Sequence, residues 1–202
     1  FPWCVCSIPT ESWARRVFPE LDTAAAMEKL WETILTTAYV DDGDAVANWH
    51  AHIEELHRRT EVLNSYRLKT LHYTNSLGTD LTVELPEGHF WAGGAEKCVT
   101  SGVLFSANIP SEEVFTLPVK TGVNGVVYAS KPLSLHGNLI EGFGFELKEG
   151  KIIRAFAQKG EDVLQKAISV DEGASYLGEV ALVPYDSPIS NSGILFYNTL
   201  FD

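Results

Sequence analysis

The fold of the larger part of the chain is decided by residues 69–85, which read KTLHYTNSLGTDLTVEL. Residues 69–74 favour an extended conformation, and residues 80–85 alternate so that one face carries Leu81, Val83 and Leu85. The residues between them, Asn75 to Thr79, are typical of a hairpin connection. The stretch therefore predicts two neighbouring strands with one apolar face, at the point where the character of the chain changes.

After this hairpin, the sequence as far as residue 159 consists mostly of short extended segments separated by Gly, Pro and Asn. Residues 138–147 and 151–157 predict a second hairpin that turns at Lys148-Glu149-Gly150. Residues 160–168 return to helical spacing, and we expect the tail after them to be extended.

The sequence before residue 69 predicts mainly helices. Residues 1–8 favour a short buried strand, and Thr10 is a candidate N-cap for a brief helix that ends before Pro19. Asp22 or Thr23 caps a helix with the apolar residues Met27, Leu30, Trp31, Ile34, Leu35 and Ala38. Asp44 caps the next helix, with the stripe Val46, Trp49, Ile53, Leu56 and Leu63. We expect these two helices to pack against each other through their stripes.

These patterns predict an α+β protein, in which an N-terminal helical part precedes a strand-rich, mostly antiparallel part. Residues 1–68 form the helical part, which is the end of an N-terminal domain. Residues 69–202 form the strand-rich domain, which carries the candidate site described below.

Composition narrows the classes of function. The chain has 202 residues, of which 45% are hydrophobic, so it can bury a core. Its 15 basic and 27 acidic residues give a net charge of −12, which argues against nucleic acid and anionic membranes as partners. No apolar run approaches the roughly 18 residues of a spanning helix, and no secretory signal is visible. Three cysteines, an odd number, favour reduced thiols in a cytosolic protein.

Two acidic segments carry the chemistry. Glu112 and Glu113 lie in NIPSEEVFTLP, residues 108–118, and Glu179 opens the apolar run in GEVALVP, residues 178–184. An ionised carboxylate among apolar residues is costly unless a cation or strong donors meet it, and a metal ion is the simplest such cation. From the residues alone, a solvated Glu112–Glu113 pair remains an alternative. So does an edge-strand or helix-capping role for Glu179.

Several stretches closely resemble the thermophilic-type metallo-aminopeptidases, the family typified by aminopeptidase T and aminopeptidase S. The resemblance runs the length of the chain and is densest after residue 105. It is carried by YLGEVALVP (176–184), SPISNSGILFYNTLFD (187–202), NIPSEEVFT (108–116), KPLS (131–134) and DEGA (171–174).

The resemblance implies a two-metal peptidase site in which Glu179 and one glutamate of the Glu112–Glu113 pair are metal ligands. Neighbouring residues of a strand point to opposite faces, so only one of the two glutamates can face the metals. Family spacing back from Glu179 favours Glu113, which is on the same strand face as Phe115 and Leu117. Glu112 is then the candidate catalytic residue, either as general base for a metal-bound water or as a partner that supports the ligand.

The same resemblance implies hydrolysis of the N-terminal residue of a peptide substrate by a cytoplasmic homodimer. The two divalent ions would be zinc, cobalt or manganese/magnesium, which carboxylate oxygens suit. One ion lowers the pKa of the attacking water, and the other polarises the scissile carbonyl and can hold the free amino terminus.

Family members continue beyond both ends of this chain. They continue into an Asn-Ala segment with a liganding histidine, a His-x-Asp motif and a catalytic tyrosine. We therefore expect this chain to be incomplete at its C-terminus, to hold only Glu113 and Glu179 of the ligand set, and to be inactive by itself.

Two other functions compete with this interpretation. One is a non-catalytic α+β binding or scaffold module, and the other is a metal-free hydrolase that uses paired carboxylates. His50, Glu54 and His57 share one face of the second helix, where a solvated polar face is favoured over a metal site. The isolated His72, His89 and His136 are expected to be hydrogen-bonded structural residues. Phe90 and Trp91 either line a cleft or, the favoured alternative, belong to the core.

Overall fold

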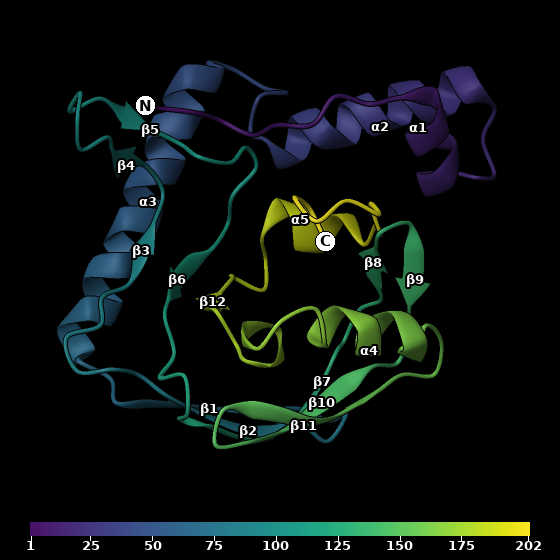
Figure 1. The fold of residues 1–202 in the computed structure, drawn as a ribbon. Helices are drawn as coiled ribbons and strands as arrows, with labels where there is room; N and C mark the ends of the chain where they lie inside the picture. Colours follow the sequence, from purple (N-terminus) through teal and green to yellow (C-terminus); the bar gives the residue numbers. More distant parts are fainter. The chain divides into compact units, whose positions relative to one another are not determined.

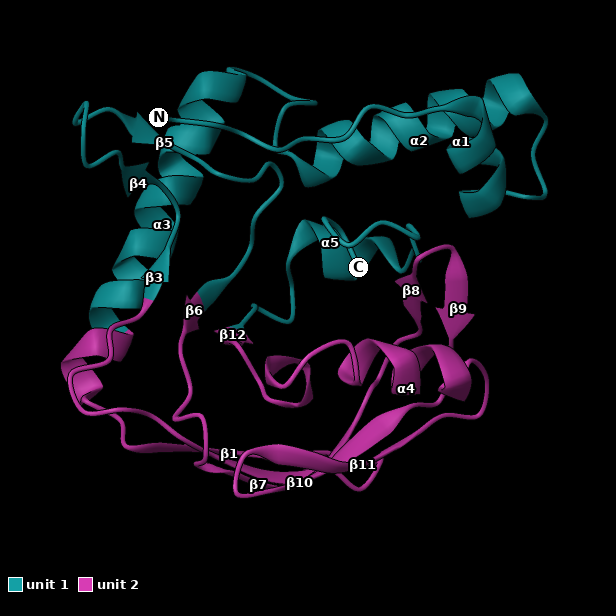
Figure 2. Ribbon diagram, viewed as in Figure 1, with its two compact units in different colours: residues 1–62, 92–114, 182–202 teal, residues 63–91, 115–181 magenta.

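The computed structural model describes residues 1–202 as two compact units (Figure 2). The first unit comprises residues 1–62, 92–114 and 182–202, and the second comprises residues 63–91 and 115–181. Helices dominate the beginning of the chain and antiparallel strands follow, so the predicted α+β class is confirmed. The division into domains 1–68 and 69–202 stays a prediction.

The first unit begins with three helices (Figure 1): α1 (Glu11–Val17), α2 (Thr23–Thr37) and α3 (Ala45–Tyr66), whose last residues belong to the second unit. The side chains of Thr10, Asp22 and Asp44 accept hydrogen bonds from backbone N–H groups in the first turns of these helices. Because the first N–H groups of a helix have no partner within it, these oxygens set the starting points, as predicted. Asp22, rather than Thr23, is the cap of α2.

The core of the first unit joins α1 and α2 to the C-terminal segment. The indole N–H of Trp13 donates to the carbonyl oxygen of Phe196, which ties the two ends of the unit together. The expected pairing of α2 with α3 is therefore wrong, because α2 buries its apolar face elsewhere. The buried residues of this core are Ala14, Phe18, Ala26, Leu30, Ile34, Phe196 and Phe201.

Two terminal stretches differ from expectation. Residues 1–8 do not form a buried strand: most of their side chains are exposed, and Val5 forms a single parallel bridge with Asn108. Apolar composition alone misled the prediction there. The tail is not wholly extended either, since it contains the short helix α5 (Pro188–Ser192). The hydroxyl of Ser187 accepts from the N–H of Ser190 and caps this helix, with a proline in its first turn.

The second unit is built on a five-stranded antiparallel sheet with the order β1-β2-β7-β10-β11. Both predicted hairpins are present, although only residues 144–148 of the predicted arm 138–147 pair with residues 151–156. Leu81, Val83 and Leu85 are buried as their alternation predicts. The strands are β1 (Thr70–Thr74), β2 (Asp80–Glu84), β7 (Val123–Tyr128), β10 (Gly144–Lys148) and β11 (Lys151–Phe156).

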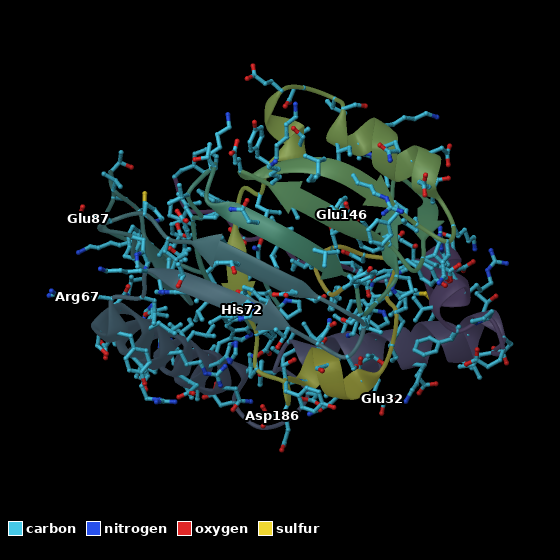
Figure 3. The ribbon with its side chains drawn as sticks, turned by 90° about the horizontal axis from the view of Figure 1, so that it is seen from below. Glu32, Arg67, His72, Glu87, Glu146 and Asp186 are labelled. Carbon is cyan, nitrogen blue, oxygen red and sulfur yellow. The ribbon has the colours of Figure 1, made fainter.

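Helix α4 (Glu161–Ile168) packs on this sheet through Leu164, which lies in a cluster with Ala155 and Ile140. The other face of the sheet is polar: the neighbouring strands place His72 against Asp80 and Glu146 against Arg154. Figure 3 labels His72 and Glu146. One covered and one solvated face is the usual arrangement of an antiparallel sheet. The hairpin β8 (Leu133–Leu135) and β9 (Asn138–Ile140) and the 3₁₀ helix η1 (Gly173–Ser175) complete the unit.

The turn between β10 and β11 requires glycine. Gly150 has φ +79°, and a Cβ atom there would clash with the carbonyl oxygen of Lys120. A side chain at this position would therefore meet both backbone strain and a steric conflict, which explains the glycine at position 150.

The remaining strands are short. A three-stranded sheet with the order β12-β6-β3 consists of β12 (Val180–Leu182), β6 (Val114–Thr116) and β3 (Ala92–Gly93). A two-stranded sheet pairs β4 (Glu96–Lys97) with β5 (Leu104–Phe105). Helices long and apolar enough to span a bilayer are absent from residues 1–202.

Candidate functional site

The two candidate glutamates of the first acidic segment point to opposite sides of an extended backbone. Glu112, Val114 and Thr116 are buried, whereas Glu113 and Phe115 are half-buried, so burial alternates with a period of two. Such alternation is the signature of an extended chain. Glu113 therefore shares a face with Phe115, as predicted, and Glu112 occupies the inner face.

Glu112 is one of the few buried ionisable residues, with 5% of its surface exposed. Its Oε1 atom accepts a hydrogen bond of 2.6 Å from the hydroxyl of Tyr39. Burial, and then this hydrogen bond to the carboxylate, raise the pKa of Tyr39 well above its ordinary value. Tyr39 thus remains a hydrogen-bond donor to Glu112 throughout the physiological range.

A second side chain holds the same segment. The Nε2 atom of His52 lies 2.6 Å from the carbonyl oxygen of Ser111, the residue before Glu112. Because a carbonyl oxygen only accepts, Nε2 of His52 carries the proton in this contact. The ring of His52 also stacks on the ring of Tyr39, with 4.4 Å between centroids, and Trp49 meets both rings edge-on.

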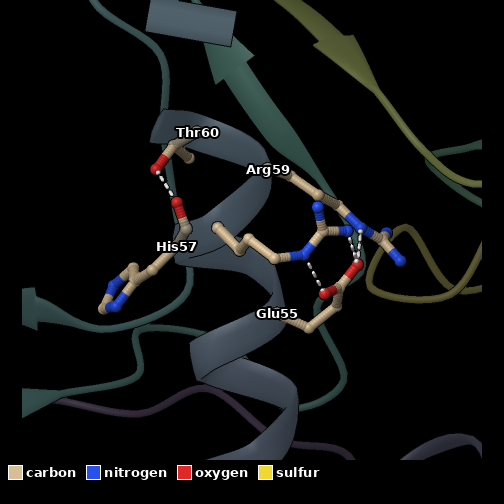
Figure 4. A network of polar contacts seen from close by, with 5 residues as sticks. Glu55, His57, Arg59 and Thr60 are labelled. Atoms are coloured by element: carbon tan, nitrogen blue, oxygen red, sulfur yellow. Dashed lines mark hydrogen bonds and ion pairs between the residues drawn. The ribbon is translucent and has the colours of Figure 1, made fainter. Parts of the chain in front are cut away.

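Two charged groups act on Tyr39 with opposite signs. The positive charge of Arg59 lowers the pKa of the hydroxyl, and the negative charge of Asp186 raises it. Arg59 is itself fixed by Glu55, which accepts hydrogen bonds from both Arg58 and Arg59 along α3 (Figure 4). These hydrogen bonds, with Arg58 contributing most, lower the pKa of Glu55 to about 2.

Glu113 lies directly before β6, where another backbone approaches it closely. A Cβ atom added to Gly93 in β3 would lie 2.8 Å from the carbonyl oxygen of Glu113. The close approach therefore requires glycine at this position of β3.

Glu179 lies directly before β12, and its side chain is exposed. Glu113 belongs to the first unit and Glu179 to the second. The convergence of their carboxylates, on which the metal site depends, therefore stays a prediction. Each glutamate directly precedes a strand of the three-stranded sheet, in which β12 and β6 are neighbours.

The donors suit a divalent ion in their chemistry but do not complete a site. Carboxylate oxygens are hard ligands for zinc, manganese or magnesium, and zinc sites commonly have about four ligands. Residues 1–202 contain no group of three or more His, Cys, Asp or Glu side chains placed to hold a metal. The assignment of Glu113 and Glu179 as metal ligands therefore stays a prediction.

Two of the isolated histidines, His72 and His89, and one histidine of the polar helix face, His57, form hydrogen bonds through their side chains. His72 bonds Asp80, His89 bonds the carbonyl of Pro86, and His57 bonds the carbonyl of Ala95. The expectation for His72 and His89 is confirmed. Of the adjacent aromatic residues, Trp91 is 2% exposed, so the favoured core position is confirmed for it. Phe90 is 70% exposed, so the same expectation is wrong for Phe90.

Sequence reasoning missed Tyr39 and His52. Tyr39 follows α2 as an ordinary end-of-helix residue, and His52 lies off the helix face that carries His50, Glu54 and His57. No local pattern marks either residue, because their role arises from contacts with Ser111 and Glu112 far along the chain.

A separate apolar cavity lies within the first unit. Its volume is about 580 Å³, and the residues that line it include Trp3, Val46, Trp49, Ile53 and Phe105. This volume is within the range of small-molecule sites.

Comparisons with known proteins identify the family of the chain. The model of the thermophilic metalloprotease (M29) family matches residues 1–202. Aminopeptidase AmpS of Bacillus subtilis is 50% identical over 200 residues, covering 99% of this chain and 48% of that protein. Aminopeptidase T of Thermus aquaticus is 46% identical with the same coverage.

The solved structure of wild-type AmpT from Thermus thermophilus superimposes with a TM-score of 0.88 at 45% identity. The match covers 96% of this chain and 47% of that one. The chain thus spans about half the length of the curated relatives it matches. With a family model that matches from end to end and relatives of this identity, the chain belongs to the thermophilic metalloprotease (M29) family.

Proposed function

We propose that this chain is part of a metal-dependent aminopeptidase, which hydrolyses the bond after the N-terminal residue of a peptide. The observation that carries the proposal is the position of the two glutamates: Glu113 directly precedes β6, and Glu179 directly precedes the neighbouring strand β12. Family membership supports the same reaction, since the relatives named above are aminopeptidases.

In this proposal Glu113 and Glu179 are metal ligands. The site takes two divalent ions, which would be zinc, cobalt or manganese/magnesium. When bound, such ions supply a water of lowered pKa and polarise the scissile carbonyl. Glu112 either accepts a proton from the attacking water or supports Glu113 from the inner face of the segment. A cytoplasmic homodimer completes the proposal, on the strength of the family resemblance.

Metal titration tests these ligand assignments. It uses the full chain, meaning the aminopeptidase of which residues 1–202 are proposed to be a part. Equilibrium dialysis against cobalt should give two ions per chain, and Glu179→Gln should reduce the number because it removes a charged ligand. Glu87→Gln serves as the control, since Glu87 is an exposed glutamate (Figure 3). Unchanged stoichiometry in Glu179→Gln would show that Glu179 is not a ligand. Activity that survives exhaustive chelation would instead favour a metal-free hydrolase.

The 202-residue chain by itself is proposed to be inactive, because two carboxylates alone bind a transition metal weakly. A leucyl or arginyl anilide with added cobalt or zinc provides the assay. Turnover by the pure 202-residue chain would refute this part of the proposal.

The second candidate function is a non-catalytic binding or scaffold module, which the apolar cavity of about 580 Å³ favours. Binding of an apolar ligand should quench the fluorescence of Trp3 and Trp49, which line this cavity. A full chain that binds two ions and hydrolyses the anilide would decide against this alternative.

A further inference from the structure

Two short hydrogen bonds hold the Ser111–Glu112 segment, one on its backbone and one on its side chain. His52 donates to the carbonyl oxygen of Ser111, and Tyr39 donates to Oε1 of Glu112, each at 2.6 Å. Tyr39 precedes α3 and His52 lies within it, and the two rings stack. A displacement of either ring would therefore disturb the other ring and the hydrogen bonds that hold the Ser111–Glu112 segment.

The backbone of Tyr39 has a strained conformation that neighbouring residues hold in place. Its φ angle is +60°, in the left-handed region that non-glycine residues rarely adopt. The side-chain amide of Asn48 holds this backbone by donating to the carbonyl of Tyr39 at 3.1 Å and to the carbonyl of Asp42 at 2.7 Å. Backbone strain of this kind persists where the surroundings fix it, and it occurs often at functional sites.

The orientation of Glu113 follows from that of Glu112. In an extended backbone the inward anchoring of Glu112 directs the next side chain to the opposite face. Freeing Glu112 would allow the segment to rotate, and the carboxylate of Glu113 would lose its fixed direction. A metal ligand needs such a fixed direction, because partners behind the ligands of a site set affinity and geometry.

We propose that Tyr39 and His52 are positioning residues of the peptidase site, which fix Glu113 through the Ser111–Glu112 segment. This inference rests on the proposed function, in which Glu113 is a metal ligand. Neither residue touches the substrate in this account. Their contribution is to hold one ligand in the direction that metal binding requires.

Tyr39→Phe in the full chain is the test, because it removes the hydroxyl and keeps the ring that stacks on His52. Cobalt affinity, followed by visible absorption, should fall about tenfold, the lower end of the effect of groups that orient ligands. The kcat for a leucyl anilide should fall by a similar factor and KM should change less, since Tyr39 itself contacts no substrate. Tyr73→Phe is the matched control, because the buried hydroxyl of Tyr73 has no hydrogen-bond partner.

A pair of His52 variants provides a second reading if Tyr39→Phe folds poorly. Glutamine can present an N–H group in place of Nε2, whereas alanine cannot. His52→Gln should therefore keep most of the cobalt affinity, and His52→Ala should lose about as much as Tyr39→Phe. Equal affinities in the two His52 variants would overturn the proposal, as would unchanged affinity and kcat in a well-folded Tyr39→Phe.

Glu113→Gln, measured in parallel, distinguishes a failure of the positioning role from a failure of the proposed function, in which Glu113 is a metal ligand. If Glu113→Gln loses cobalt while the Tyr39 and His52 variants behave as the parent, the positioning role is wrong and the ligand assignment stands. If Glu113→Gln binds cobalt as the parent does, the ligand assignment fails and the positioning role fails with it.

Discussion

The hydroxyl of Tyr39 donates a 2.6 Å hydrogen bond to the carboxylate of Glu112, 73 positions away in the sequence. This contact joins the end of α2 to the acidic segment before β6. It also gives the two adjacent glutamates different surroundings. Glu112 is the inner, anchored residue, and Glu113 is left on the opposite face as the candidate ligand.

This contact predicts a difference in stability between two Tyr→Phe substitutions. Tyr39→Phe removes a donor from a buried carboxylate and should lower the free energy of unfolding by about 1.5–3 kcal/mol, the range for hydrogen bonds to charged groups. Tyr73→Phe should leave it nearly unchanged or slightly raised, because its buried hydroxyl has no partner to lose. Urea unfolding of both variants measures the difference, and equal losses would contradict the role of the Tyr39 hydroxyl.

The arginine pair on α3 predicts a low pKa for Glu55. Hydrogen bonds from Arg58 and then Arg59 lower the pKa of Glu55 to about 2. Since its pKa is lower in the folded than in the unfolded chain, Glu55 stabilises the fold above its unfolded pKa, and this contribution is lost as pH falls towards 2. Carboxyl NMR shifts recorded against pH provide the measurement.

In that titration Arg58→Gln should raise the pKa of Glu55 more than Arg59→Gln does, because Arg58 makes the larger contribution. A Glu55 carboxyl that titrates near the ordinary value of about 4.3 in the unsubstituted chain would contradict the network.

The turn at Gly150 predicts that Gly150→Ala destabilises the fold more than Gly88→Ala does. Gly150→Ala meets both a positive φ and the Lys120 carbonyl, so it should cost more than the roughly 1–3 kcal/mol of backbone strain alone. Gly88 has nearly the same φ, +77°, and the space that an added Cβ atom would fill is open there, so Gly88→Ala isolates the strain. Thermal unfolding should show the larger decrease in Tm for Gly150→Ala, and equal decreases would show that the steric conflict is relieved at no cost.

Local patterns sufficed for much of the fold. The alternation of Leu81, Val83 and Leu85 predicted a strand with one buried face, because burial on a pleated sheet repeats every two residues. The caps Asp22 and Asp44 predicted helix starts, since their side-chain oxygens accept hydrogen bonds from N–H groups that have no partner within the helix. Helix α5 was missed because five residues rich in hydroxyl groups have no apolar period.

Long-range contacts were beyond such patterns. The expected packing of α2 on α3 was wrong, because an apolar stripe does not specify its partner, and Phe196 and Phe201 come from the far end of the chain. Residues 1–8 were wrongly expected to be buried for the same reason. At the candidate site, the acids could be named from the sequence and its resemblance. The roles of Tyr39 and His52 could be identified only from their contacts with Glu112 and Ser111 in the structure.

The most direct test of the peptidase site is a crystal structure of the full chain grown with zinc, with anomalous data collected at the zinc edge. We expect anomalous peaks beside β6 and β12, with carboxylate oxygens of Glu113 and Glu179 about 2.0–2.2 Å from the ions. Zinc bound elsewhere, or these two carboxylates directed to separate places with no ion between them, would contradict the account.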